Sequence, residues 1–355
     1  MNHYILVNKF TAHMQNGCPM LISVIVSTYS PERLGDVKRL ITSLEVQNDK
    51  GFELVVIVDE NQRLCSDIKQ TLSNTTIAKW RVVLNCMNNG LAHSRNIGIK
   101  KTTGEVVAFI DDDAIADPGW ISSIRRVFTN PQVGAATGDI IPRWEKPNMA
   151  WFPKELHWII SCSYSITPTR RCHIDRGFGA DMAFSREALI RVGSFDERFG
   201  INKNRWLGGE DTDLFLRVKD AGYHVIFEPD MRVRHTIYAS RITLPKIVNR
   251  SVAQGMGSYY IRRYSDVEIP VYSSQEYLFK LASDFIPRSI RNVFSRRTIL
   301  TIREISTVSI SMISIAAGAL LARFTPFIEV PQFERLVANE VTPQGESDCY
   351  ITDSN

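Results

Sequence analysis

The 355-residue chain lacks several patterns that would assign it at once to a common class. Its formal net charge is only +4, which is too small to indicate a nucleic-acid partner. None of its six cysteines forms a Cys-x-x-Cys pair, and no group of cysteines and histidines has the spacing of a zinc site. Thiols scattered in this way favour a reducing compartment. Neither an internal repeat nor a low-complexity segment is visible, so we expect one large domain with an appendage.

The two ends of the sequence also lack the patterns of a packed core. Residues 1–19 contain no continuous apolar segment long enough for a signal peptide, and we expect them to be an N-terminal extension. The fold is expected to begin near Met20. Residues 331–355 are acidic and polar towards the end, which predicts a flexible tail.

Short apolar runs rich in β-branched residues alternate with longer polar segments along residues 20–240. The runs at 21–28, 52–59, 80–85 and 105–110 are continuous, which is typical of strands buried on both faces. Ser30 followed by Pro31 predicts the start of a helix after the first run. The alternation predicts an α/β fold, Rossmann-like, with a mostly parallel sheet and helices on both faces.

Three consecutive aspartates, Asp111, Asp112 and Asp113, follow the fourth predicted strand. Their like charges repel, so we expect a positive partner there. A divalent cation such as Mg²⁺ or Mn²⁺ binds carboxylate oxygens and leaves positions open for phosphate. The alternative is a solvated acidic turn in which Asp113 or Asp117 caps the next helix.

Polar residues follow other predicted strands as well, and ligands of parallel sheets bind beyond these carboxyl ends. Tyr29 could stack on a base. Asp59 and Glu60 could accept hydrogen bonds from a base or ribose, or could simply be polar loop residues. Arg95 could pair with a phosphate, or could be a surface arginine. The aspartate trio and these residues should converge on one crevice.

The segment GGEDTD at 208–213 begins another predicted helix. Glu210, Asp211 and Asp213 suit the positive end of a helix for structural reasons alone. One of these carboxylates could instead be a general base that takes a proton from an attacking hydroxyl. Gly209 would let the backbone approach a ligand closely. His235 gains functional meaning only if it completes a metal site with Asp113.

Seven segments in order carry a resemblance to a known family: SVIVSTYSP, VVIVDEN, NNGLAHSRNIG, FIDDD, GADMAFSRE, GGEDTDL and VRH. Together they resemble the family 2 inverting glycosyltransferases of the GT-A fold, over roughly residues 20–240. The resemblance implies a nucleotide-sugar donor. The residues that it implies as donor contacts are Ser27, Tyr29, Asp59, Glu60, Arg95, Asp111, Asp112, Asp181, Gly209 and Glu210.

The same resemblance implies the chemistry of the site. Asp111 and Asp113 match the D-x-D motif that holds Mn²⁺ or Mg²⁺, with His235 as a further ligand. Asp211 matches the catalytic base. Asp59-Glu60 departs from the usual Asp-Asp of the family, which leaves open which carboxylate contacts the base. The family's processive members carry Q-x-x-R-W and several membrane spans; neither is found here, so we expect transfer of a single sugar.

STYSPERL, FIDDDAIADPGW and WFPKELHW are similar to segments of archaeal transferases that add a hexuronic acid to dolichyl-phosphate-linked glucose. This narrower resemblance implies UDP-glucuronate as donor and a lipid-linked acceptor. Two other functions stay open. A nucleotidyltransferase would need a glycine-rich loop after the first strand, which TYSPERL lacks. A non-catalytic nucleotide-sugar-binding subunit would not need Asp111, Asp113 and Asp211 intact.

Residues 241–330 are predicted to be helical and basic. The stretch 305–322 has no charged residue and is at the short limit of a membrane span, and arginines precede it. It could span the membrane, lie on its surface, or pack as a soluble helix. A basic segment before an apolar one suits anionic lipid, which predicts a catalytic domain on the cytoplasmic face of the membrane, peripheral or single-pass.

Overall fold

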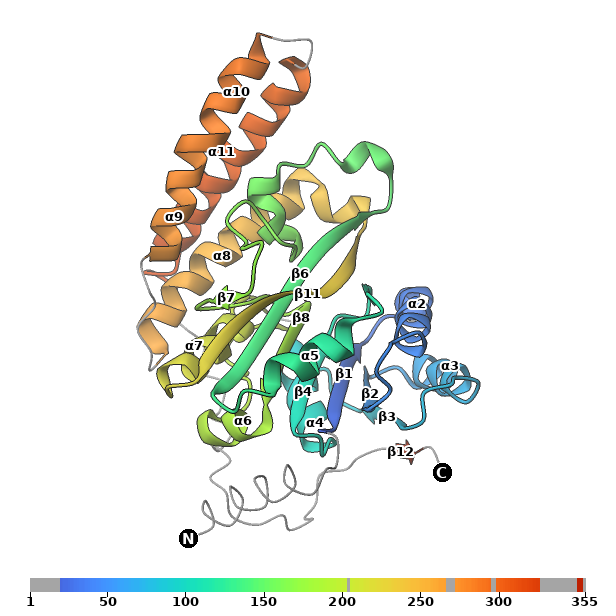
Figure 1. The fold of residues 1–355 in the computed structure, drawn as a ribbon. Coiled ribbons are helices and arrows are strands. Elements are labelled where there is room, and N and C mark those ends of the chain that lie inside the picture. Colours follow the sequence, from blue (N-terminus) through green and yellow to red (C-terminus); the bar gives the residue numbers. More distant parts are fainter. Residues whose placement is uncertain (1–19, 203–204, 266–271, 295–297, 326–349, 354–355) are drawn as a thin grey trace.

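The computed structural model describes residues 20–202, 205–265, 272–294, 298–325 and 350–353 (Figure 1). The predicted N-terminal extension and most of the predicted tail lie outside these residues. Within the predicted tail, residues 350–353 form a strand paired antiparallel with residues 81–84. Cys86 is disulfide-bonded, whereas Cys65, Cys162 and Cys172 are free thiols.

A ten-stranded sheet forms the centre of the structure, in the order β12-β3-β2-β1-β4-β8-β6-β11-β5, with β7 paired to β11. Its strands are β1 (Ile22–Thr28), β2 (Phe52–Asp59), β3 (Trp80–Asn85), β4 (Val106–Ile110), β5 (Ala114–Ala116), β6 (Val133–Trp144), β7 (Cys172–His173), β8 (Asp181–Ser185), β11 (His224–Ile237) and β12 (Tyr350–Asp353). A separate two-stranded sheet joins β9 (Ile201–Asn202) to β10 (Arg205–Trp206).

The four strands predicted in the first part of the chain agree with β1 to β4 within one residue. They are mutually parallel in the order β3-β2-β1-β4, as expected for continuous apolar runs. β8 then lies antiparallel between β4 and β6, so the second half of the sheet is mixed. The α/β class is confirmed, and the carboxyl ends of β1, β2 and β4 meet at one edge.

Helices cover both faces of this sheet. They are α2 (Leu34–Glu45), α3 (Gln62–Leu72), α4 (Leu91–Lys100), α5 (Trp120–Phe128), α6 (Arg186–Val192) and α7 (Glu210–Asp220). Val24 and Val26 of β1 pack in the core beneath α2, α3 and α5. Ile25, between them, packs in the opposite core beneath α4, α6 and α7. Both faces are therefore buried, because side chains alternate along a strand.

The helix starts differ in detail from the prediction. The chain leaves β1 through η1 (Pro31–Arg33), a single 3₁₀ turn that precedes α2. Ser30 adopts the extended conformation of a cap, but its side chain makes no capping hydrogen bond. At α5 the cap is Gly119, and Asp117 lies outside the helix.

The predicted helical region after residue 240 is confirmed. It contains η4 (Ala239–Ile242), α8 (Leu244–Tyr264), α9 (Tyr272–Lys280), the π-helical turn η5 (Leu281–Phe285), α10 (Ile286–Val293) and α11 (Thr298–Leu321). α8 lies along the sheet domain, whereas α9, η5, α10 and the start of α11 project from it as a helical arm (Figure 1). We refer to residues 272–302 as the arm.

α8 and α11 pack through glycines. A Cβ atom added at Gly255 would lie 2.0 Å from the carbonyl oxygen of Ile315, and one added at Gly318 would lie 2.1 Å from that of Val252. Both contacts are with backbone, which a rotamer change cannot relieve. The two helices can approach this closely only because both positions lack a side chain.

We predict that Gly255→Ala lowers the free energy of unfolding by about 1–3 kcal/mol, because α8 and α11 must separate to admit the methyl group. Chemical denaturation of the full chain measures this. Gly35→Ala on α2 is the control, since its added Cβ would meet only the flexible Arg39 side chain at 3.7 Å. Equal stability of both variants would contradict the close contact.

Candidate active site

The aspartate trio leaves β4 at the sheet edge and meets His235 of β11. Ala114 of β5 is paired in register with His235, which brings Asp113 next to the histidine. Ligand atoms of Asp111, Asp113 and His235 all lie within 4.8 Å of one another. The predicted metal ligands are therefore brought together from the turn between β4 and β5 and from β11, which is distant in the sequence.

His235 is fully buried, and its contacts fix the orientation of its ring. Its Nδ1 lies 3.0 Å from the carbonyl oxygen of Ile160, which can only accept a hydrogen bond. Nδ1 therefore carries a proton, and Nε2 faces Asp113, 2.9 Å from its Oδ1. A backbone carbonyl that orients the ring in this way is typical of metal-binding histidines. Two carboxylates and this nitrogen fit a divalent cation such as Mn²⁺ or Mg²⁺.

Asp113 is also surrounded by arginines that the sequence did not single out. Its Oδ2 accepts hydrogen bonds from Arg33 at 2.6 Å and from Arg241 at 2.7 Å. Burial by itself would raise the pKa of Asp113, but His235, Arg241 and Arg33 hold it well below its ordinary range. The expected positive partner of the trio is thus supplied in part by the chain itself.

Asp112 points to the other side of the trio. Its carboxylate accepts a hydrogen bond of 2.6 Å from the hydroxyl of Thr28 at the end of β1. Burial and the neighbouring Asp113 raise the pKa of Asp112 to about 7. This hydrogen bond joins the aspartate turn to β1. The predicted contact of Asp112 with the nucleotide-sugar donor stays a prediction.

Arg95 links the trio to α7. Its side chain is buried; Nη2 lies 3.3 Å from Asp111 and 3.0 Å from the carbonyl oxygen of Gly179, and Nη1 lies 3.1 Å from Glu210. The interpretation of Arg95 as a surface arginine is therefore wrong. Its proposed role at a phosphate stays a prediction, because its contacts here are with protein groups.

The predicted base lies at the start of α7, directly after Gly209, whose φ of 115° favours glycine. Asp211 is partly exposed, and its Oδ2 accepts a 2.8 Å hydrogen bond from the backbone N–H of Gly179. Glu210 is buried, and burial together with Asp211 raises the pKa of Glu210 to about 7. Asp211 is thus the more accessible of the two carboxylates.

The predicted base-binding residues lie at the ends of β1 and β2. Tyr29 is 62% exposed. The Ser27 hydroxyl is buried and has no hydrogen-bond partner among the described residues. Asp59 is buried and accepts 2.6 Å hydrogen bonds from Asn85 and Ser94. Burial raises the pKa of Asp59. The two hydrogen bonds offset part of the free energy that burying this carboxyl group costs.

Glu60 follows at the end of β2 with a φ of 53°, which places it in the left-handed region.

Asp181 differs most from its predicted place. It is fully buried, and its Oδ1 accepts a 2.8 Å hydrogen bond from the Trp120 indole. Burial raises the pKa of Asp181 to about 8. Its carboxyl group therefore lies inside the protein in this structure, and a role on the pocket wall stays a prediction.

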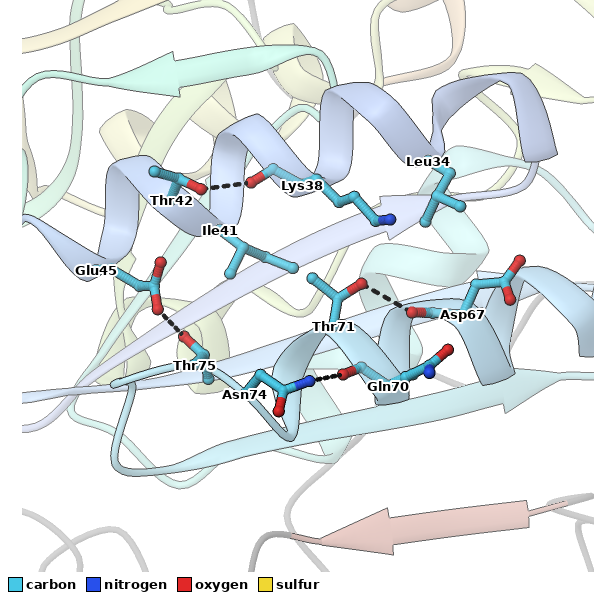
Figure 2. Close-up of a pocket in the computed structure, with 10 residues that line it drawn as sticks. All are labelled: Leu34, Lys38, Ile41, Thr42, Glu45, Asp67, Gln70, Thr71, Asn74 and Thr75. Atoms are coloured by element: carbon cyan, nitrogen blue, oxygen red, sulfur yellow. Dashed lines mark hydrogen bonds between the residues drawn. The ribbon is translucent and has the colours of Figure 1, made fainter.

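A separate surface groove lies between α2 and α3 (Figure 2). Three threonine hydroxyls along it donate local hydrogen bonds: Thr42 to the carbonyl of Lys38, Thr71 to the carbonyl of Asp67, and Thr75 to the carboxylate of Glu45. None of the residues lining the groove is among the predicted site residues. The candidate metal ligands lie instead at the edge formed by β1, β4 and β11.

Residues 23–199 match the family described as glycosyl transferase family 2, and residues 163–239 match the one described as N-terminal domain of galactosyltransferase. The chain belongs to glycosyltransferase family 2. The family and its named relatives make the chain a glycosyltransferase, an enzyme.

Two relatives show how far the similarity extends. The glucosyl-dolichyl phosphate glucuronosyltransferase of Haloferax volcanii is 26% identical over 313 residues, which cover 86% of the transferase and 97% of the relative. The succinoglycan biosynthesis protein ExoM of Rhizobium meliloti is 21% identical over 236 residues, which cover 66% and 72% of the two chains.

The fold has a solved counterpart. The mannosyltransferase PcManGT of Pyrobaculum calidifontis, solved in complex with GDP-Man and Mn²⁺, superposes with a TM-score of 0.55 at 15% identity. The match covers 90% of the transferase and 96% of PcManGT. The GT-A fold expected for the transferase is confirmed.

We predict that Asp181→Asn makes the stability of the transferase less sensitive to pH. Folded Asp181 keeps its proton up to about pH 8, whereas the unfolded carboxyl loses it near 3.8. The free energy of unfolding therefore falls as pH rises between these values, by up to about 1.4 kcal/mol per unit. Asparagine stays neutral and can still accept from Trp120.

Urea unfolding at pH 5 and pH 8 measures this difference. The stability of Asp181→Asn relative to the wild type should rise with pH. Asp220→Asn, an exposed change at the end of α7, is the control and should show no such trend. A wild type and an Asp181→Asn variant with parallel pH profiles would contradict a buried neutral Asp181.

Proposed function

We propose that this enzyme transfers one sugar from a UDP-sugar to a hydroxyl of a lipid-linked acceptor, with inversion at the anomeric carbon. One observation carries the proposal: hydrogen bonds connect the candidate metal ligand Asp111 to the proposed base Asp211. Arg95 donates to Asp111 and to the carbonyl of Gly179, and the N–H of Gly179 donates to Asp211. Such a framework holds a base at a defined position relative to the cation site.

In the proposed reaction the acceptor oxygen forms a bond to the anomeric carbon as the bond from that carbon to the diphosphate breaks. The carboxylate of Asp211 takes the acceptor proton, and the diphosphate leaves with the bonding electron pair. A divalent cation held by Asp111, Asp113 and His235 would neutralise the charge that develops on the diphosphate. Attack opposite the leaving group inverts the configuration.

The ends of β1 and β2 supply the proposed binding surface for the base. Tyr29 is largely exposed, which suits stacking, and the Ser27 hydroxyl lacks a partner among the described residues. A buried hydroxyl without a partner costs free energy that a bound ligand can recover. Asp59 and Glu60 border the same edge. Each Asp59 oxygen already accepts one hydrogen bond and has capacity for a second.

The substrates are proposed from the relative in Haloferax volcanii. Its name specifies glucuronosyl transfer to glucosyl-dolichyl phosphate, and the alignment covers 97% of its length. We therefore propose UDP-glucuronate as donor, and a dolichyl- or polyprenyl-phosphate-linked sugar as acceptor. A lipid-linked acceptor requires the enzyme to reach a membrane surface.

The arm is the proposed membrane contact. Among the described residues, α11 is the one helix long and apolar enough to cross a membrane. Apolar side chains on the arm are at least half exposed: Leu278, Phe279, Ile286, Ile290, Phe294, Ile299 and Ile302. We propose that they insert into the lipid of the cytoplasmic face, as a peripheral or single-pass anchor.

The arm is also tied to the active site through η3 (Lys154–Ile160). Arg288 lies 3.1 Å from the buried carboxylate of Glu155, and the hydroxyl of Tyr277 donates to the Glu155 carbonyl at 2.9 Å. The last residue of η3, Ile160, accepts the hydrogen bond from His235. One short segment thus connects the proposed membrane contact to the metal cluster.

We predict that Asp211→Asn lowers transfer by on the order of a thousandfold, because the acceptor proton loses its base, while donor affinity stays within about threefold. Transfer is assayed with UDP-glucuronate and a membrane lipid extract, and donor affinity by calorimetry. Asp220→Asn at the other end of α7 is the control with the same charge change. An Asp211→Asn variant that transfers at the wild-type rate would eliminate Asp211 as the base.

We also predict that the double change Ile290→Glu and Phe294→Glu weakens binding to vesicles containing anionic phospholipid by about tenfold or more, because two apolar side chains can no longer enter the lipid. Vesicle co-sedimentation measures this. Val46→Glu, which changes an exposed apolar residue at the end of α2, is the control. Undiminished binding of the double variant would contradict docking through the arm.

A further inference from the structure

Arg241 lies across two of the three candidate metal ligands. Its Nη2 donates to Oδ2 of Asp113 at 2.7 Å, and its Nη1 lies 3.2 Å from Nε2 of His235. Nδ1 of His235 faces the carbonyl oxygen of Ile160, so Nε2 is the ring nitrogen left to bind a cation. The guanidinium therefore lies against the same two residues that a cation would bind, and the two cannot occupy this place at once.

Arg33 contacts Asp113 as well, but it has a second anchor. Its Nη1 lies 2.6 Å from Asp113 and 3.6 Å from Asp36, and its guanidinium stacks over the Tyr238 ring at 5.1 Å. If Arg33 released Asp113, its contacts with Asp36 and Tyr238 would still hold the Arg33 side chain beside the site. It does not contact His235, so it shares only part of the position that Arg241 takes.

Much of the local negative charge is already compensated without a cation. Asp111, Asp112 and Asp113 carry at most three negative charges, and three guanidiniums lie on this trio: Arg33 and Arg241 on Asp113, and Arg95 on Asp111. A divalent ion that entered alone would displace Arg241 and leave an excess of positive charge. A diphosphate brings the negative charge that released guanidiniums can bind.

We propose that Arg241, supported by Arg33, is an internal counter-ion that occupies the cation site until the donor arrives. The two arginines then move from Asp113 to the diphosphate, and the cation takes the position that Arg241 leaves. The cation and the nucleotide diphosphate consequently bind tightly only together. This inference rests on the proposed function, since it requires a diphosphate-bearing donor at this site.

The test measures Mn²⁺ binding to the full chain by the EPR signal of free Mn²⁺, without nucleotide and with saturating UDP. In the wild type, UDP should tighten Mn²⁺ binding by at least about tenfold. In Arg241→Gln, Mn²⁺ alone should bind at least about tenfold more tightly than to the wild type, and UDP should add less than about threefold. Arg33→Gln should change in the same direction by a smaller factor.

Arg126→Gln is the control, because Arg126 is exposed and pairs with Asp230 outside the site. Circular dichroism confirms that each variant is folded. Mn²⁺ binding by Arg241→Gln that is no tighter than in the wild type, or wild-type binding that UDP does not strengthen, overturns the counter-ion role. If Mn²⁺-dependent sugar transfer is still observed, the proposed function survives that result; if transfer never occurs with any nucleotide sugar, the proposed function fails instead.

Discussion

Negative charge buried at the end of β4 is the constraint on which the rest of the site depends. Asp113 has almost no exposed surface, and an unpaired carboxylate there would strongly destabilise the fold. His235, Arg33 and Arg241 meet this requirement from three different segments. The turn after β4, the start of α2 and the segment after β11 are therefore tied together by charge, and the same charge is what suits the site to a cation.

Two linkages carry this arrangement outward. Arg95 connects the aspartate trio to Gly179 and Glu210, so the position of α7 depends on the trio. η3 connects it in the other direction, because Ile160 orients His235 while Glu155 anchors the arm through Arg288. The candidate metal ligands, the proposed base and the proposed membrane contact are thus connected through these contacts. Changes to the arm are expected to reach the site through η3.

The strands and their polar ends could be predicted from local pattern alone. The continuous apolar runs are buried on both faces, and the residues after them lie at one edge as parallel strands require. The grouping of Asp111 with His235 was also predicted, though only through resemblance to a family. Asp181 shows the limit: the family resemblance implied a donor contact, and only the structure shows that its place in β8 buries it against Trp120.

The sequence by itself determined the α/β class, the glycosyltransferase family and the candidate cation ligands, because these depend on short-range pattern and on residue type. Only the tertiary structure decided which positive groups balance those ligands. Arg33 and Arg241 stand 208 positions apart in the chain and have no pattern that distinguishes them from surface arginines. Their role arises from burial, which makes charge balance compulsory among groups that folding brings within hydrogen-bond distance of Asp113.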